Sequence, residues 1–193
     1  MTRWDISVRG GGAKKTDCRT EEGDRTALMK SIILRRTVSV VARDGIGAFS
    51  AKTVAEESGC SEGLIFHYYG NKKNLLDSCY QFVCSEFLKG LEGRDDGTLR
   101  TFWEYYCEFM MDNEDMATFL LGYIRFEGGK GILGDIFIER LNRDYGDRGE
   151  DYVLSVAKLL ILIGCLLSVE PLGLRGCSMA EYRDVFDQIL RKE

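Results

Sequence analysis

The chain has 193 residues, of which 45% are apolar, and this is enough to bury the core of one ordinary or two small domains. A charged fraction of 30%, 11% aromatic residues and a single proline exclude collagen-like, proline-rich and wholly disordered chains. Residues 1–80 hold 13 Lys and Arg against 10 Asp and Glu, whereas residues 81–193 hold 13 against 21. The basic first part suits a polyanionic partner, and the acidic remainder argues against a membrane surface.

The seven cysteines form no CxxC pair, so the sequence lacks the pattern of a secreted disulfide framework. The first residues also lack the apolar stretch of a secretory signal. The longest apolar run, at residues 152–169, is short for a membrane span and contains Lys158, so we expect a buried interface helix there. These features predict a cytoplasmic protein.

The predicted elements are all helical. A flexible tail is expected at residues 1–24, where glycines and basic side chains show no apolar periodicity. Helical spacing of apolar residues, interrupted by glycines and one proline, then predicts nine helices, at residues 25–44, 51–58, 62–69, 72–92, 98–112, 114–127, 131–145, 151–169 and 179–192. Because no alternating strand pattern is present, the predicted fold class is all-α.

The second and third predicted helices have the spacing of a helix-turn-helix. Each has about eight residues, too few for stability in isolation, and the turn Gly59-Cys60-Ser61 allows them to pack across each other. Ser50 and Ser61 are placed to cap the two helices, and Asn71 to cap the long helix that follows. In such a motif, the second helix is presented to the major groove of DNA.

Residues 45–76 resemble the DNA-binding segment of the tetracycline-repressor (TetR) family. The residues that carry the resemblance are Ser50, Val54, Ala55, Gly59, Ser61, Gly63, Phe66, Tyr68, Tyr69, Lys72 and Leu75. The resemblance implies a helix-turn-helix domain at residues 25–71 and an effector-binding and dimerisation domain at residues 72–193.

Residues of the two short helices and their ends are expected to contact DNA. Ser61 and Gly63 begin the second helix, where free backbone N–H groups attract phosphate and glycine permits a close approach. Lys52 and Lys72 are placed to neutralise phosphates, and Tyr68 to touch the DNA backbone, whereas the outward side chains of Thr53, Glu62, Leu64 and His67 would read base edges. The candidate set is Ser50, Lys52, Thr53, Ser61, Glu62, Gly63, Leu64, His67, Tyr68 and Lys72. For Thr53, Glu62, Leu64, His67, Tyr68 and Lys72, a solvated surface side chain is the alternative.

An enzyme is not expected. His67 is the only histidine, so a zinc site with a histidine ligand or a histidine-dependent nucleophile would have to be built on the DNA-reading helix. No glycine-rich phosphate loop follows a strand, and the adjacent acids Glu56 and Glu57 are expected to face solvent. We predict no catalytic residue, metal or cofactor.

Residues 102–126 hold eight of the 21 aromatic residues. Flat and polarizable side chains can enclose an apolar or aromatic effector, or they can simply fill the core. The candidate pocket residues are Trp103, Tyr106, Phe109, Met110, Phe119, Tyr123 and Phe126. The resemblance implies a ligand cavity in this half of the chain.

The last two predicted helices are the candidates for a dimer interface because their apolar residues recur at helical spacing. The residues chosen are Leu159, Leu162, Leu166, Tyr182, Phe186 and Ile189. A two-fold dimer would bind an inverted-repeat operator, and a ligand that prefers another half-site spacing would release it. We predict a homodimeric repressor released by a small molecule. An architectural DNA-binding protein of the same fold, without an effector, is the alternative.

Overall fold

In the computed structural model of the chain, residues 17–127, 131–149, 152 and 156 are described. Their elements are the helices α1 (Asp17–Asp44), α2 (Ala51–Ser58), α3 (Glu62–Tyr69), α4 (Lys72–Glu92), α5 (Leu99–Asp112), α6 (Glu114–Glu127) and α7 (Ile132–Tyr145), and a 3-10 turn at Gly146–Arg148. The all-α prediction is confirmed for these residues. The predicted count of nine helices is not matched: seven α-helices are described, and the helices expected at 151–169 and 179–192 fall almost wholly outside the described part.

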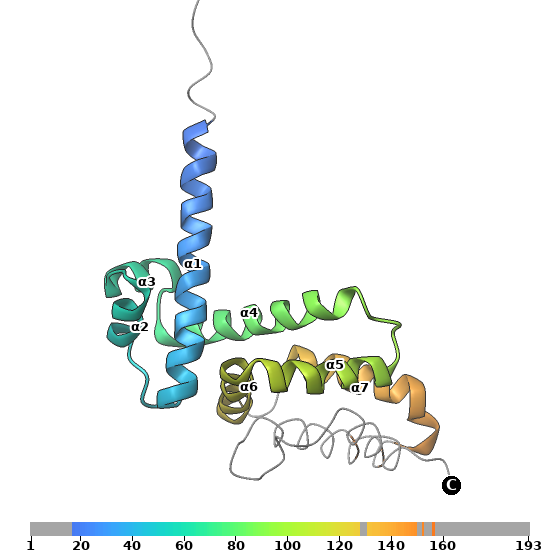
Figure 1. The fold of residues 1–193 in the computed structure, drawn as a ribbon. Coiled ribbons are helices and arrows are strands. Elements are labelled where there is room, and N and C mark those ends of the chain that lie inside the picture. Colours follow the sequence, from blue (N-terminus) through green and yellow to red (C-terminus); the bar gives the residue numbers. More distant parts are fainter. Residues whose placement is uncertain (1–16, 128–130, 150–151, 153–155, 157–193) are drawn as a thin grey trace, which may run out of the picture.

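Helix α1 begins at Asp17, so the expected tail of residues 1–24 is wrong for residues 17–24. The prediction placed the start at residue 25, where apolar periodicity begins. Extending an existing helix costs less than nucleating one, and the single glycine in this stretch, Gly23, is tolerated within it. In Figure 1, this end of α1 projects past the other helices. Its helical structure is therefore stabilised by continuity with the packed part of α1.

The helices form two connected parts (Figure 1). Helices α1, α2 and α3 pack together around the beginning of α4, while α5 and α6 also pack against α4 and α7 packs against α5. Helix α6 also packs against α1. Because α4 belongs to both parts, a displacement of this helix would move residues in both.

An aromatic cluster fills the second part. Its centre is Phe87 of α4, which is fully buried. The ring centroid of Phe87 lies 5.3 Å from Phe102, 5.0 Å from Tyr105, 6.2 Å from Tyr106 and 5.3 Å from Phe109, in tilted or edge-on arrangements. Such geometries add attraction between rings to the gain from burial, so α4 and α5 are firmly joined here.

Ionic contacts join α7 to the connection between α4 and α5. Arg140 donates to both carboxylate oxygens of Asp95, at 2.7 and 2.6 Å, and its side chain is only 12% exposed. The hydrogen bond from Arg140 is the main reason that the pKa of Asp95 lies below its usual value. Nearby, Asp144 accepts a hydrogen bond from the backbone N–H of Leu99 at 2.8 Å. The carboxyl end of α7 is therefore fixed to the start of α5.

Among the described helices, none combines the length and the hydropathy that a membrane span requires.

Candidate nucleic-acid interface and effector cavity

The three predicted helix caps of the helix-turn-helix segment are confirmed. Ser50 Oγ accepts a hydrogen bond from the N–H of Thr53 at 3.1 Å, and Ser61 Oγ accepts one from the N–H of Leu64 at 3.2 Å. Asn71 Oδ1 accepts one from the N–H of Asn74 at 2.9 Å, at the start of α4. These caps account for the closely spaced ends of α2, α3 and α4.

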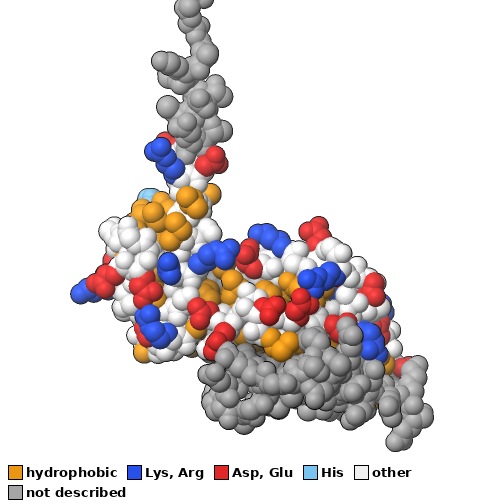
Figure 2. All heavy atoms as spheres, viewed as in Figure 1, with side chains coloured by type: hydrophobic (Ala, Val, Ile, Leu, Met, Phe, Trp, Pro, Cys, Tyr) orange, Lys and Arg blue, Asp and Glu red, His pale blue; other side chains and the backbone are white. Residues whose placement is uncertain are grey.

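Helix α3 shows one side to the protein and the other to solvent. Within α3, only Ile65 is buried, with no exposed surface. Glu62, Gly63 and His67 are exposed, and Leu64 is half-buried. The histidine side chain, pale blue in Figure 2, lies on the surface next to apolar side chains. Three of the five predicted contacts in this helix are thus exposed, and the other two, Leu64 and Tyr68, are half-buried.

Gly63 is not required by the packing of the protein itself. A Cβ atom built at this position would meet only Ser61 Oγ, at 3.9 Å. Glycine within a helix costs roughly 1 kcal/mol relative to alanine. The described structure therefore contains no internal reason for a glycine at this position, and its role in a close approach to DNA stays a prediction.

Two of the candidate hydroxyl groups bind each other. Ser50 Oγ and Thr53 Oγ1 are 2.8 Å apart, and Ser50 already caps α2. Thr53 is half-buried, whereas Lys52, next to it, is exposed. The structure thus gives the hydroxyl of Thr53 a hydrogen-bond partner within the protein. The sequence analysis expected Thr53 to contact a base and did not include this bond.

Lys72 contacts the protein more closely than the sequence indicated. Its Nζ donates to the carbonyl oxygen of Phe49 at 2.7 Å and lies 4.1 Å from the centroid of the Phe49 ring. Phe49 is 1% exposed and directly precedes the cap of α2. Lys72 therefore ties the first turn of α4 to the start of α2, and an ammonium group has two further N–H bonds with which to meet a phosphate.

The sequence analysis missed Lys30. Its Nζ lies 5.2 Å from the centroid of the Tyr68 ring, and its carbonyl oxygen accepts a hydrogen bond from the hydroxyl of Tyr69 at 3.2 Å. This residue of α1 therefore places a positive charge beside the carboxyl end of α3. No local signal could have identified Lys30, because its position next to α3 depends on the packing of α1.

Arg43 and the predicted solvent-facing Glu57 form an ion pair at 2.9 Å. Arg43 also pairs with Asp44, and the hydrogen bonds that Arg43 donates to these two carboxylates, the one to Asp44 first, raise its pKa. This cation is therefore neutralised by its neighbours, in contrast to Lys52.

An apolar cavity of about 40 Å³ lies between α4, α5, α6 and α7. Its lining residues are Tyr80, Phe102, Trp103, Tyr106, Met110, Leu120, Ile124, Leu133 and Phe137. None of them is charged. Cavities that hold effectors usually measure several hundred Å³, so this one has to widen to accept a molecule larger than a few atoms.

The cavity includes three of the seven predicted pocket residues: Trp103, Tyr106 and Met110. Phe109, Phe119 and Tyr123 are buried but do not line it. Phe126 is 57% exposed. It was misplaced because it follows Ile124 by two residues, which turns it about 200° around α6 from the side facing the cavity.

The buried cysteines have no activated thiol. Cys79, Cys84 and Cys107 are free and buried. Burial raises the pKa of each of them, that of Cys84 to about 11, and so disfavours the reactive thiolate. These three residues therefore pack as small apolar side chains.

The described residues contain no group of three or more His, Cys, Asp and Glu side chains that is arranged to hold a metal ion. The predicted interface residues, Leu159, Leu162, Leu166, Tyr182, Phe186 and Ile189, lie outside the described part of the chain.

Residues 33–79 match a family model described as "Bacterial regulatory proteins, tetR family". The chain is 34% identical over 73 residues to the HTH-type transcriptional regulator BetI of Vibrio parahaemolyticus, which covers 38% of this chain and 35% of the relative. It is 28% identical over 110 residues to an uncharacterized HTH-type transcriptional regulator of Haemophilus influenzae, over 54% of this chain and 59% of that one. The chain thus spans about a third to three fifths of the length of these relatives.

Solved structures extend the similarity of the fold beyond the helix-turn-helix. A TetR-like transcriptional regulator from Rhodococcus sp. RHA1 superposes with a TM-score of 0.65 at 17% identity, over 84% of this chain and 93% of the other. The TetR family regulator PfmR from Thermus thermophilus gives a TM-score of 0.59 at 17% identity, over 83% and 95%. The predicted resemblance at residues 45–76 is confirmed by the family match.

Proposed function

We propose that this chain, whose residues 33–79 match the TetR family model, is a repressor that binds an inverted-repeat operator as a homodimer and is released by a small apolar or aromatic effector. The observation that carries the proposal is the presentation of α3. Its single buried residue, Ile65, holds the helix to the core, while its amino-terminal turn and its outer side face solvent.

Groups suited to DNA surround this exposed side. The free N–H groups at the start of α3 can meet a phosphate, and Gly63 lets the phosphate come close. Lys52 and Lys72 lie at the starts of α2 and α4, and Lys30 lies beside the end of α3. This arrangement supports binding in the major groove with basic side chains on the adjoining phosphates.

A single α3 supports recognition of only half an operator. Eight helical residues span about 12 Å, which matches a few base pairs in one major groove. Two copies related by a two-fold axis would read an inverted repeat, as proposed.

The cavity supports an uncharged effector. Its lining is aromatic and aliphatic, and α4 contributes Tyr80 to it. The first turn of α4 is bound to the start of α2 through the hydrogen bond from Lys72 to the carbonyl oxygen of Phe49. A molecule that widens the cavity would therefore act on the helix that carries the DNA-binding part, which provides a route for release.

The DNA proposal is tested by selecting duplexes retained by the purified chain from a random pool, which should yield an inverted repeat. Lys72→Ala should weaken binding to all duplexes and reduce the slope of log affinity against log salt by about one, since a phosphate contact is lost. His67→Ala should change the preferred sequence. If both variants keep the affinity and preference of the parent chain, α3 does not read DNA.

Lys52→Ala is the matched control, because Lys52 is exposed at the start of α2. Equal losses of slope in the two lysine variants would assign both to phosphates. A lower affinity with an unchanged slope in Lys72→Ala alone would mean that Lys72 acts by holding Phe49.

The effector proposal is tested through Trp103, which is 1% exposed and lines the cavity. In a Trp4→Phe background, Trp103 is the single tryptophan, so its emission reports on the cavity alone. Compounds from a metabolite panel that change this emission should also lower the affinity for the selected duplex. A compound that releases DNA without affecting Trp103 would move the effector site elsewhere. A panel without any binder, together with cooperative spreading on DNA, would favour the architectural alternative.

A further inference from the structure

Tyr123 of α6 holds α4 at two points one turn apart. Its ring stacks on Tyr80, with a centroid distance of 4.6 Å and an angle of 11° between the ring planes. Its hydroxyl donates to Asp77 Oδ1 at 2.8 Å. Tyr123 is 7% exposed and Tyr80 is 5% exposed. The two contacts fix the position of α6 along α4, because one contact is a flat stack and the other a directional bond to a charged group.

The same segment of α6 forms part of the cavity wall. Leu120 and Ile124, on either side of Tyr123 in the sequence and one turn apart, line the cavity. Tyr80 lines it as well, so the stacked pair stands at the edge of the cavity. An occupant larger than the present 40 Å³ would therefore press on residues that directly flank Tyr123.

Tyr123 is also packed against its own helix. Phe119 is fully buried and stacks on the Tyr123 ring at a centroid distance of 5.8 Å. Because both residues belong to α6 and are buried, the Tyr123 ring has to move together with α6.

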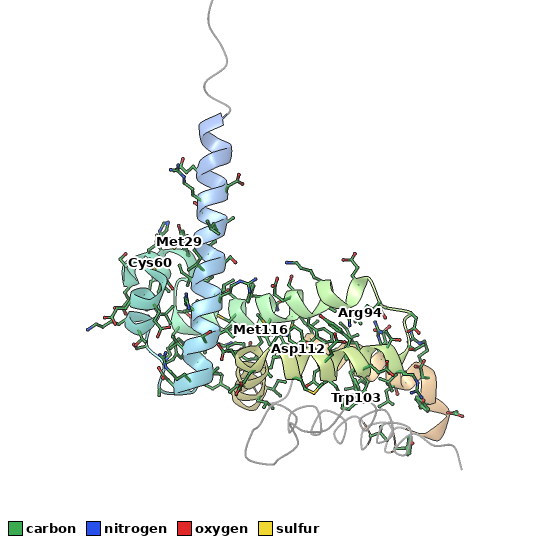
Figure 3. All side chains as sticks on the ribbon, in the orientation of Figure 1. Met29, Cys60, Arg94, Trp103, Asp112 and Met116 are labelled. Atoms are coloured by element: carbon green, nitrogen blue, oxygen red, sulfur yellow. The ribbon has the colours of Figure 1, made fainter. Side chains whose placement is uncertain are left out.

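Asp77 lies close to the DNA-binding part. It follows the first residue of α4, Lys72, by little more than one turn, and it also pairs with Lys73 at 3.1 Å. In Figure 3, Met116 of α6 lies beside the crossing of α1 and α4, whereas Trp103 of α5 lies away from this crossing. A force on α6 therefore acts on α4 near its amino end, next to the helix-turn-helix, and not near its carboxyl end.

We propose that Tyr123 is the coupling residue between the cavity and DNA binding: when the cavity is filled, α6 is displaced, and Tyr123 carries the first turns of α4 with it. The proposal rests on the proposed function and specifies how the effector acts. Removing the hydroxyl keeps the flat stack, which is not directional, and removes the directional bond to Asp77, so it should uncouple the cavity from the DNA-binding surface while leaving both intact.

The experiment fills the cavity from within, so that no effector has to be known. Leu120→Phe adds volume to a lining residue that is 2% exposed. In the full chain, it should lower the affinity for the selected duplex by about 5- to 150-fold, the usual range for coupling between two sites. Tyr123→Phe alone keeps the stacked ring and should change this affinity by less than about threefold. In the double variant, the effect of Leu120→Phe should fall below about threefold, a departure from additivity that measures the coupling.

Two controls separate coupling from a loss of stability. Tyr105→Phe removes a hydroxyl from another half-buried tyrosine of the aromatic cluster and should not relieve the effect of Leu120→Phe. Leu91→Phe makes the same enlargement at a buried position near the other end of α4 and should leave duplex affinity unchanged. Thermal unfolding of every variant shows whether it is folded.

If Leu120→Phe does not fold, Ile124→Phe fills the cavity from a half-buried position on the same side of α6. Asp77→Ala removes the acceptor of the Tyr123 hydrogen bond, so it should uncouple the cavity from the DNA-binding surface as Tyr123→Phe does. The proposal is wrong if filling the cavity leaves duplex affinity unchanged, or if its effect persists in Tyr123→Phe and Asp77→Ala. Failure of the parent chain to retain any duplex would instead refute the proposed function.

Discussion

Replacing Gly63 by leucine is expected to lower the affinity for the selected duplex by about 100-fold or more, without lowering the stability of the protein. Two hydrogen bonds from the start of α3 to phosphate would be lost, and hydrogen bonds to charged groups contribute about 1.5–3 kcal/mol each. The free energy of unfolding should not fall, because a Cβ at this exposed position would touch only Ser61 Oγ. Duplex titration and thermal unfolding of the same sample measure both effects.

Gly63→Ala and Gly134→Ala form a matched pair for this prediction. Both add one methyl group to a helix, and a Cβ at Gly134 would meet no atom within 4 Å. Both should gain up to about 1 kcal/mol of stability from helix propensity, but only Gly63→Ala should weaken DNA binding. Equal duplex affinities in the two variants would show that no partner approaches the backbone at the start of α3.

Phe87→Ala should produce the largest loss of stability, about 3–5 kcal/mol in the free energy of unfolding. Phe87 is fully buried and contacts four aromatic rings of α5, so its removal forfeits the gain from burying the ring and leaves a cavity in its place. Chemical denaturation measures this change. Phe126→Ala, at a position that is 57% exposed, is the control and should remain within about 0.5 kcal/mol of the parent chain.

A loss in Phe87→Ala no greater than that in Phe126→Ala would mean that the cluster does not hold α4 to α5. Both variants lose a phenylalanine side chain, so the difference between their two free energies of unfolding reports the packing around Phe87.

The ends of α2, α3 and α4 were predictable because their signals are local. Ser50, Ser61 and Asn71 accept the capping bonds that the sequence indicated, and Gly59 ends α2 in a left-handed conformation with φ of 66°. The start of α1 was missed, because its first turns have no apolar side to mark them. Their helicity follows from propagation of the helix, which leaves no periodic pattern in the sequence.

The cavity and the surroundings of the basic residues were only partly predictable. Aromatic density identified Trp103 and Tyr106, but Tyr80 and Phe137 reach the cavity from other helices and carry no local signal. Lys72 was correctly placed at the start of α4, yet the sequence could not show that the carbonyl oxygen of Phe49 would be its partner. Such contacts depend on how helices pack, and packing is not encoded in the spacing of a single segment.

The ion pair between Arg140 and Asp95 restricts how the cavity can widen. It holds the carboxyl end of α7 to the connection between α4 and α5, so we expect the cavity to widen more easily at the amino end of α7, where Leu133 lines it. The side chains of Arg140 and Asp95 are 12% and 27% exposed, so added salt should screen this ion pair in part. Acid should loosen it: the pKa of Asp95 is lower in the folded chain, so the stabilisation is present above the ordinary carboxyl pKa and declines as the pH falls below it. Low pH should therefore make the cavity easier to widen.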